Sequence, residues 1–269
     1  MAASHTTTVT LQKLADFCSD YLPALAGYIR PSEYAAAEAS AQMHIIYQGL
    51  AKAYPEAGAI YWGSRAWKLW LWQPVFIGVW GASCLHVCPR FDDFTHQMNP
   101  LFTEAYTLPP QDLAVRTQAE AVAQTAAHLK TWAVRELVLL QTHYPLPEKL
   151  ALYYLGDALL NALASAHRFS LIDADEILQL EKMWQAALDI RCCGGLVWQE
   201  DAQEFLVEML SCCQHYRRNG AEHCQGCPKT RKQRGLPPCG RSSEDTSPAL
   251  KTVCRDTEWK IFPEGDFLR

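Results

Sequence analysis

Four cysteines near the C-terminal end of the chain have the residue type and the spacing needed to bind a metal. Cys212 and Cys213 are adjacent, and Cys224 and Cys227 follow in the pattern C-C-x10-C-x2-C. Thiolates at such spacings bind zinc, bind an iron–sulfur cluster or form disulfides. The residues alone leave these three kinds of chemistry open.

The adjacent position of Cys212 and Cys213 favours one of these three kinds of chemistry over the others. Zinc sites usually take their thiolates from two C-x-x-C-like turns, and Cys224 and Cys227 fit one such turn. Adjacent residues point their side chains in different directions, so Cys212 and Cys213 fit a single zinc ion poorly. A two-iron cluster accepts neighbouring ligands that do not converge on one metal. The spacing therefore favours an iron–sulfur cluster, with zinc and inert or disulfide-bonded thiols as the remaining interpretations.

The composition points to a reducing compartment. The chain contains eleven cysteines, which is an odd number, and its first residues lack the apolar core of a secretory leader. Clustered thiols in a reducing compartment favour metal or redox chemistry over disulfides. We therefore expect a cytoplasmic protein. Its formal net charge of −5 gives no general reason to expect a nucleic-acid partner.

The sequence around these cysteines resembles that of the FhuF-like ferric-siderophore reductases. The similarity covers the segment CCQHYRRNGAEHCQGCP, with its aromatic–Arg stretch, its Gly and its closing Cys-Pro. The upstream segment YWGSRAWKLWLWQP is similar to a Trp- and Arg-containing helix of that family. The resemblance implies a [2Fe–2S] cluster bound by Cys212, Cys213, Cys224 and Cys227 in a mainly helical protein.

The resemblance also implies a one-electron reductase of ferric siderophores. Siderophores hold Fe3+ through hard oxygen donors, which bind the softer and larger Fe2+ far less tightly. Reduction therefore releases the iron, and a [2Fe–2S] cluster carries the single electron that this needs. The implied partners are a ferric siderophore and an electron donor such as a ferredoxin or a reductase. Peripheral contact with the inner face of the cytoplasmic membrane, through the tryptophans, stays open.

Two other kinds of protein remain as alternatives. One is a zinc-stabilised interaction module in which the four cysteines are structural, and the other is an iron–sulfur redox sensor without turnover. Cys239 and Cys254 lie in a C-terminal extension that the resemblance does not lead us to expect. They raise a rival set of ligands, in which one of them replaces one of the four cysteines. Cys192 and Cys193, a second adjacent pair, are a further alternative source of ligands.

Other potential ligands are interpreted as having different roles. His215 and His223 flank the four cysteines, and we expect them to be exposed or to donate hydrogen bonds near the cluster. Cys84 and Cys88 have no matching second pair nearby and are interpreted as packing residues.

Basic residues gather around the cysteines. Between positions 212 and 234 the chain carries six Arg or Lys residues, including Arg217 and Arg218, against a single acid, Glu222. We expect this patch to bind an anionic ferric siderophore, an acidic electron donor, or both. A solvated loop with no binding role would have the same composition.

Two residues of the tryptophan-rich segment are candidate siderophore contacts. Arg65 and Trp72 would lie on one face of a helix, where the guanidinium of Arg65 would meet the negative charge of the substrate. The alternative interpretation is that most of these tryptophans belong to the core and that Arg65 pairs with a buried carboxylate.

The predicted fold is mainly α: a multi-helix domain with a small β-hairpin or sheet in the middle and a cysteine-rich loop near the C-terminus. We divide the chain into a helical scaffold that binds the siderophore (1–210), a cluster motif (211–229) and a C-terminal extension (230–269), within one structural domain. The apolar run at 69–88 is interpreted as a buried helix leading into a strand, because Gln73 and Pro74 interrupt it as a membrane span.

Periodicity and capping residues predict the individual elements. Thr117 and Glu120 have the spacing of a capping box, and Asp173 or Asp175 is suited to cap a later helix. Helices are expected over 11–25, 31–54, 117–144, 148–169, 173–190 and 199–213. Strands are expected at 76–87 and 104–110, on either side of a polar turn at 89–100.

Overall fold

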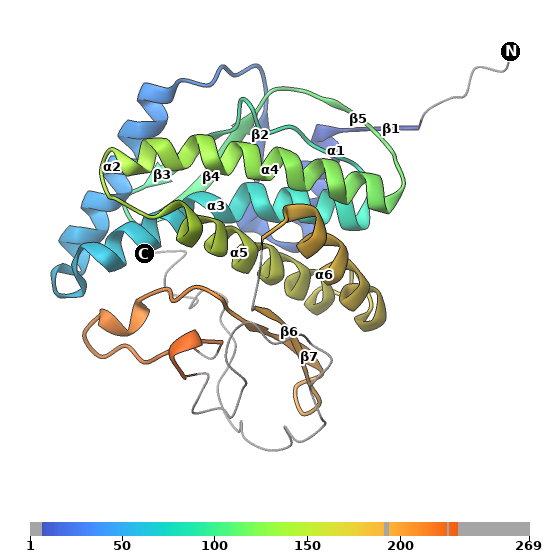
Figure 1. Ribbon diagram of the computed structural model, residues 1–269. Coiled ribbons are helices and arrows are strands. Elements are labelled where there is room, and N and C mark those ends of the chain that lie inside the picture. The colour runs from blue at the N-terminus through green and yellow to red at the C-terminus, as the bar shows by residue number, and fades with distance from the viewer. Residues whose placement is uncertain (1–6, 191–193, 225, 231–269) are drawn as a thin grey trace, which may run out of the picture.

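The structure is a computed structural model that describes residues 7–190, 194–224 and 226–230. Six α-helices make up most of this part of the chain, so the mainly α-helical fold predicted from the sequence is confirmed (Figure 1). The helices are α1 (Leu11–Tyr21), α2 (Ala36–Ala53), α3 (Gly58–Cys84), α4 (Gln118–Gln141), α5 (Glu148–Arg168) and α6 (Ala174–Leu188).

Helix α3 forms the centre of the core. It packs against α2, α4 and α5, and its rings at Trp67, Trp70, Trp72 and Trp80 are all buried. A helix that is apolar on every side belongs in a protein interior. In the part of the chain that the structure describes, no helix combines the length and the apolar character needed to cross a lipid bilayer.

The sequence correctly predicted that the run 69–88 begins as a buried helix, but it placed the end of this helix too early. Helix α3 continues to Cys84, so the strand predicted over 76–87 is wrong. A short apolar run buried on all sides has no period that separates helix from strand. Because Gly78 and Gly81 have no side chains, Thr125 of α4 and Leu14 of α1 pack directly onto this part of α3.

In the residues that the structure describes, seven short strands form three small sheets around the helices. In the first, β1 pairs antiparallel with β5; in the second, β4 pairs with β2 and β3; and in the third, β6 pairs antiparallel with β7. The strands are β1 (Thr8–Thr10), β2 (Gly27–Ile29), β3 (Thr95–Asn99), β4 (Phe102–Leu108), β5 (Asp112–Ala114), β6 (Gly195–Gln199) and β7 (Glu204–Glu208).

The predicted pair of strands in the middle of the chain is present, with one strand where it was expected. Strand β4 corresponds to the strand predicted at 104–110. Its antiparallel partner is β3, which lies inside the segment predicted to be a polar turn. His96 explains the error, because this polar residue of β3 is buried among Trp70, Phe94 and Trp132 and so does not mark a solvent-exposed turn.

The helix predicted over 199–213 is wrong, because the hairpin of β6 and β7 occupies most of that segment. The paired residues Trp198 and Phe205 meet edge to face, with their ring centroids 5.0 Å apart, and His167 of α5 packs against both rings. Aromatic pairs of this kind stabilise antiparallel strands. Packing against α5 therefore outweighs the local preference for a helix.

Several helix ends follow the predicted signals. The capping box of Thr117 and Glu120 is present at α4, and Asp173 caps α6 through the backbone N–H of Glu176. The largest differences from the predicted helix boundaries are at α1 and α2. Helix α1 ends before Pro23, because proline there begins a separate 3-10 turn, and α2 begins at Ala36 rather than at Pro31.

Candidate metal centre

The segment that carries the four cysteines crosses one end of the helical core. We call residues 209–230 the cysteine loop, and the structure describes all of them except position 225. The loop follows β7 and lies beside α5 and the first half of α3 (orange in Figure 1). A backbone hydrogen bond of 3.1 Å from Met209 to the carbonyl oxygen of Gly226 joins its two ends.

A buried carboxylate on α5 anchors the start of the loop. Asp157 accepts backbone hydrogen bonds from Leu210 (2.7 Å) and Ser211 (2.8 Å), and it also accepts one from the Ser211 hydroxyl. Next to it on α5, the hydroxyl of Tyr154 donates to the carbonyl oxygen of Cys212 at 2.6 Å. Both α5 side chains are almost fully buried, so they hold the adjacent cysteines at a defined position on the core.

Asp157 is also expected to make stability depend on pH. Burial is the main cause that raises the pKa of its carboxyl from 3.8 to about 6, and the hydrogen bonds from Ser211 and Leu210 oppose the rise. The folded protein therefore holds this proton more tightly than the unfolded chain does. The part of its contribution to stability that comes from holding this proton is fully present below about pH 4 and is lost as the pH rises through about 6.

We expect the free energy of unfolding of the wild type to fall relative to that of an Asp157→Asn variant as the pH rises through this range. The fall should reach about 3 kcal/mol. Urea denaturation of both proteins between about pH 4 and pH 7 measures it, because the other titrating groups are common to both and cancel in the difference. A difference that stays constant with pH would contradict the raised pKa.

The loop brings the four thiols together as two pairs. The sulfur atoms of Cys213 and Cys224 are 3.7 Å apart, and the thiol of Cys212 forms a hydrogen-bonded contact with Cys227. None of the cysteines that the structure describes forms a disulfide. Each pair therefore combines one residue of the adjacent dipeptide with one residue of the C-x-x-C turn. A backbone hydrogen bond of 3.0 Å from Cys227 to Cys224 closes that turn.

The electrostatic environment favours a thiolate at one of these positions. A hydrogen bond from the Cys224 thiol, the positive charge of Lys68 and the backbone N–H of His215 lower the pKa of Cys213 to about 5, against the effect of burial. The hydrogen bond that Cys224 donates raises its own pKa. Burial raises the pKa of Cys212 to about 11. Cys213 is therefore the thiol that ionises first, and a thiolate is the form that binds metals.

The donor set fits a cluster of two metals. Two thiolates on one tetrahedral metal, with bonds of about 2.3 Å, lie about 3.8 Å apart. The 3.7 Å between Cys213 and Cys224 matches that separation. Within the described residues, no group of three or more Cys, His, Asp or Glu side chains is arranged to hold a metal ion. Four thiols arranged as two pairs are the ligand chemistry of a [2Fe–2S] cluster.

The other cysteines and histidines considered from the sequence lie away from the four thiols, in other roles, or outside the described residues. Cys84 packs against the core at the C-terminal end of α3, and the sulfur of Cys88 lies 3.4 Å from Nδ1 of His128, so neither belongs to the cysteine loop. Within the loop, the ring of His223 stacks on that of Tyr216 at 4.7 Å. The rival ligands lie outside the part of the chain that the structure describes: Cys192, Cys193, Cys239 and Cys254.

The structure separates the two substrate residues predicted on α3. Arg65 lies close enough to Tyr61 for its charge to oppose the burial-driven rise in the pKa of that phenol, and the ring of Tyr61 in turn contacts His215 of the cysteine loop. Trp72 is buried in the core, where its indole N–H donates to the hydroxyl of Thr103. Arg65 is therefore beside the cysteine loop, whereas Trp72 is not.

The guanidinium groups predicted on the loop lie against the start of α3. Arg217 donates to the carbonyl oxygen of Ala57 at 3.1 Å, and the guanidinium of Arg218 lies 4.0 Å from the ring centroid of Tyr54. Both contacts reach the 3-10 turn Pro55–Ala57 or the residue before it. The structure thus brings Arg65, Arg217 and Arg218 to one end of the core.

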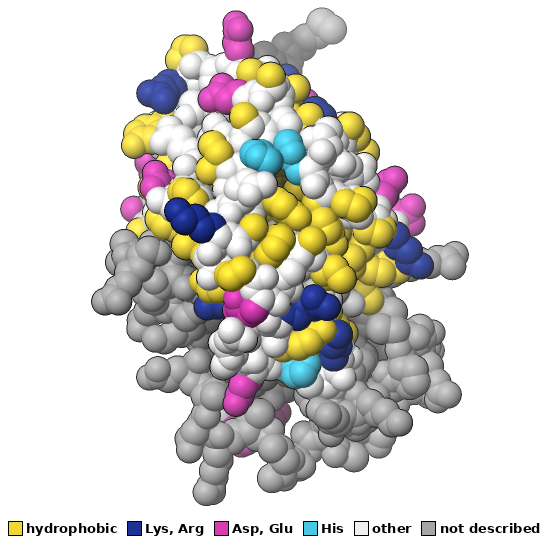
Figure 2. Space-filling view, turned by 90° about the vertical axis from the view of Figure 1, so that its left-hand side faces the viewer, with side chains coloured by type: hydrophobic (Ala, Val, Ile, Leu, Met, Phe, Trp, Pro, Cys, Tyr) yellow, Lys and Arg dark blue, Asp and Glu magenta, His cyan; other side chains and the backbone are white. Residues whose placement is uncertain are grey.

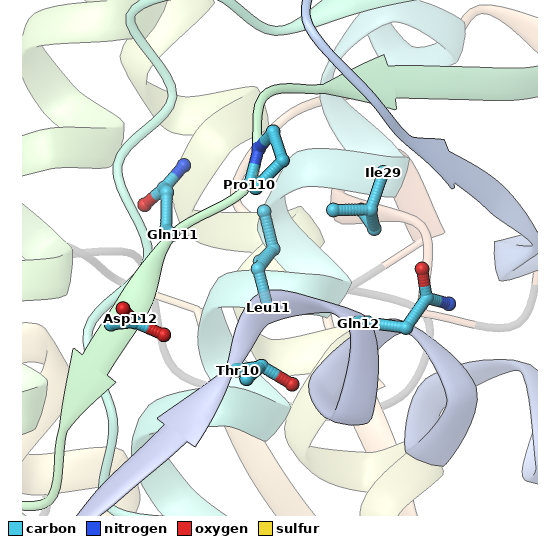
Figure 3. A pocket seen from close by; sticks show the side chains of 7 residues that line it. All are labelled: Thr10, Leu11, Gln12, Ile29, Pro110, Gln111 and Asp112. Carbon is cyan, nitrogen blue, oxygen red and sulfur yellow. The ribbon is translucent and has the colours of Figure 1, made fainter.

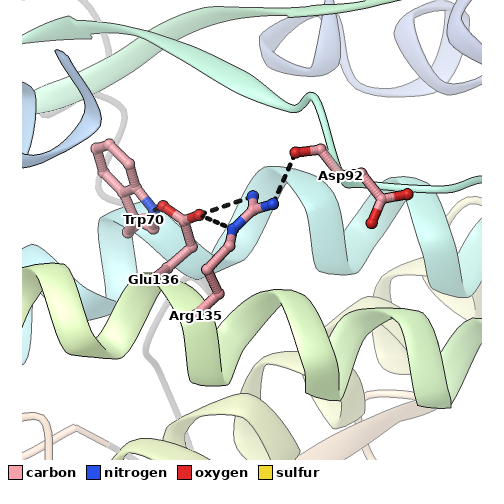
Figure 4. Close-up of polar contacts among 4 residues, drawn as sticks. All are labelled: Trp70, Asp92, Arg135 and Glu136. Carbon is pink, nitrogen blue, oxygen red and sulfur yellow. Dashed lines mark hydrogen bonds and ion pairs between the residues drawn. The ribbon is translucent and has the colours of Figure 1, made fainter. Parts of the chain in front are cut away.

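A second buried carboxylate, that of Glu136, is held by hydrogen bonds that explain its place in the core. Glu136 of α4 accepts hydrogen bonds from the indole of Trp70 at 3.0 Å and from Arg135 at 2.9 Å, and Arg135 also donates to the carbonyl oxygen of Asp92 at 2.7 Å (Figure 4). Burial is the main cause that raises the pKa of Glu136, and the charge of Arg135 opposes it. The network holds the loop before β3 against α4.

An open pocket of about 350 Å³ at the start of α1 is remote from the cysteine loop (Figure 3). Helix α1 contacts the second half of α3, through Leu14 and Gly81, whereas the cysteine loop lies at the first half. The ionisable group among the lining residues is an acid, so the pocket is poorly suited to an anionic ligand. Its lining residues are Thr10, Leu11, Gln12, Ile29, Pro110, Gln111 and Asp112.

Sequence reasoning missed three residues that shape the centre: Tyr154, Asp157 and Lys68. One signal was available, because an aspartate inside the apolar run LGDALL of a helix indicates a buried acid that needs donors. The chain matches no model of a known protein family, and no solved structure matches it.

Proposed function

We propose that the protein is a ferric-siderophore reductase that uses a [2Fe–2S] cluster held by Cys212, Cys213, Cys224 and Cys227. The observation that carries this proposal is the arrangement of the four thiols as two pairs, each drawing one residue from the dipeptide and one from the C-x-x-C turn. The arrangement supports two metals better than one zinc ion. The order of the ligands along the chain is that of the FhuF-like reductases, which the sequence resembles.

The residues of this chain would hold and tune the centre. When bound, the cluster supplies one electron at a time for the reduction of Fe3+ in the substrate. Asp157 and Tyr154 fix the backbone of the adjacent cysteines, and the positive charge of Lys68 favours the ionised form of Cys213. Burial and hydrogen bonding of this kind set the potential of an iron–sulfur centre.

Substrate reduction in this scheme needs no general acid or base. The protein has to bring the ferric complex close to the centre, and the released Fe2+ then leaves because oxygen donors hold it weakly. A one-electron donor such as a ferredoxin or a reductase would restore the electron. We place the reaction in the cytoplasm. Membrane contact through the tryptophans is not part of this proposal, because Trp67, Trp70, Trp72 and Trp80 are buried.

The test is spectroscopic. We expect anaerobically purified protein to be red-brown and to give a paramagnetic resonance signal after reduction by dithionite. A Cys213→Ser variant should lose or alter that signal, whereas a Cys88→Ser variant, changed outside the cysteine loop, should keep it. A colourless protein with about one zinc per chain, in which iron–sulfur reconstitution also fails, would favour the zinc-stabilised interaction module instead.

Turnover separates the reductase from a sensor. Dithionite-reduced protein, freed of excess dithionite, should be reoxidised by a ferric siderophore, and the Fe2+ formed should be captured by a ferrous chelator. A protein that holds the cluster but is not reoxidised by ferric chelates of any class would be a redox sensor without turnover.

A further inference from the structure

The surface beside the cysteine loop combines positive charge with aromatic rings. Tyr54, Arg65, Arg217 and Arg218 form what we call the basic–aromatic face, and the buried ring of Tyr61 lies next to Arg65 and Arg218. Arg218 lies over the ring of Tyr54 at 4.0 Å, and Tyr61 contacts His215, two residues from Cys213, with their ring centroids 6.5 Å apart. The face therefore reaches to within a few residues of the candidate ligands.

Aromatic side chains continue from this face along α3 and α2 to the segment that follows α4. The indole of Trp62 donates to the carbonyl oxygen of Tyr54 at 2.8 Å and meets the ring of Tyr47 edge to face at 5.9 Å. Tyr47 in turn stacks on Tyr144 at 6.1 Å. Hydrophobic side chains gather across the middle of this side of the molecule, with basic side chains next to them, as Figure 2 shows. Ile60, which is 46% exposed, belongs to the same stretch of α3.

The charge of this region is opposite to that of the whole protein. Three arginines belong to the basic–aromatic face and Lys68 adds a fourth positive charge near the thiols, whereas the chain as a whole has a net charge of −5. Three acids offset part of this charge: Glu56, which accepts a hydrogen bond of 3.0 Å from the backbone of Asn219, Glu222 of the cysteine loop, and the buried Asp157. A local excess of positive charge draws anions to the end of the core where the thiols lie.

We propose that the basic–aromatic face binds the ferric chelate and selects anionic, aromatic chelates of the catecholate class over neutral hydroxamate chelates. This inference rests on the proposed function only in taking a ferric chelate as the ligand. A ferric ion held by catecholate dianions in all its coordination positions is a trianion, whereas the matching hydroxamate complex is neutral. Catechol rings also stack on guanidinium and aromatic planes, which this face supplies side by side.

The test measures binding without electron transfer. Ga3+ has the charge of Fe3+ but is not reduced, so gallium chelates report recognition alone. Tryptophan fluorescence of the anaerobically purified full-length protein would be titrated with gallium tris-catecholate, with a gallium tris-hydroxamate and with gallium tris-oxalate, a trianion without rings. We expect the catecholate to bind at least about tenfold more tightly than the hydroxamate, and the oxalate to lie between them.

Matched variants assign the selectivity to this face. Arg217→Gln with Arg218→Gln should weaken catecholate binding by at least about tenfold and leave hydroxamate binding within about twofold. Arg90→Gln, which removes an exposed arginine beyond the C-terminal end of α3, should change neither. The visible spectrum of each variant shows whether it keeps the same centre as the wild type, so a loss of binding through misfolding is recognised.

The outcomes separate this inference from the proposed function. Equal affinity for the gallium catecholate and the neutral hydroxamate, or selectivity that survives the double arginine substitution, overturns the inference even if ferric chelates are reduced. Selective binding of the gallium catecholate that the double substitution abolishes supports the inference, even if the protein proves unable to reduce the ferric complex.

Discussion

An Asp157→Ala variant is expected to lose about 3–5 kcal/mol of its free energy of unfolding and to release the start of the cysteine loop from α5. The carboxylate accepts the backbone hydrogen bonds of Leu210 and Ser211 and a third from the Ser211 hydroxyl, and it is almost fully buried. Alanine leaves those hydrogen-bond donors unsatisfied at a buried site, where water does not replace the lost acceptor. The adjacent cysteines then lose the support that positions them.

Two measurements check this prediction. Urea denaturation gives the free energy of unfolding, and the rate of thiol alkylation in metal-free protein reports how well the loop is held. An Asp20→Ala variant, which changes an exposed aspartate of α1, is the matched control and should differ from the wild type by less than about 0.5 kcal/mol. A loss below about 1 kcal/mol at position 157, with unchanged alkylation, would show that Asp157 does not anchor the loop.

The sequence predicted correctly those features of the fold that depend on residues close together in the chain, such as helix caps. The capping box of Thr117 and Glu120 and the cap at Asp173 depend on residues three apart, and both were found as predicted. The hairpin of β6 and β7 was missed because Phe205, Leu206 and Val207 are contiguous and fit either period. Contact with α5 settles their conformation, and that helix lies tens of residues away in the sequence.

The candidate centre also has one part that the local sequence predicted and another part that depends on the packed fold. The spacing of the cysteines identified the loop, because ligands of one cluster lie close together in the chain. Their surroundings were not predictable, since Lys68 and Asp157 reach the loop only after α3 and α5 have packed. The pairing of Cys213 with Cys224 likewise depends on how the chain turns between them, and nothing in the spacing determines that turn.

A Gly226→Ala variant is expected to disrupt the cysteine loop as severely as the loss of Asp157. A Cβ atom at position 226 would lie 1.9 Å from the carbonyl oxygen of Val207 in β7. That oxygen is part of a paired strand and cannot move aside, and the hydrogen bond from Met209 to Gly226 holds the two backbones together. We expect a loss of about 4 kcal/mol in the free energy of unfolding. The turn of Cys224 and Cys227 should also be displaced from Cys212 and Cys213.

Gly220→Ala is the matched control, because it makes the same change in the same loop. No atom lies within 4 Å of a Cβ at Gly220, and its positive φ of 73° alone should cost about 1 kcal/mol. Urea denaturation and the visible spectrum after anaerobic purification compare the two variants. If both lose the same free energy and keep the wild-type spectrum, the close approach of Gly226 to β7 does not determine how the thiols are paired. If only Gly226→Ala loses the spectrum, the seating of the turn against β7 is what brings the two pairs within reach of a shared cluster.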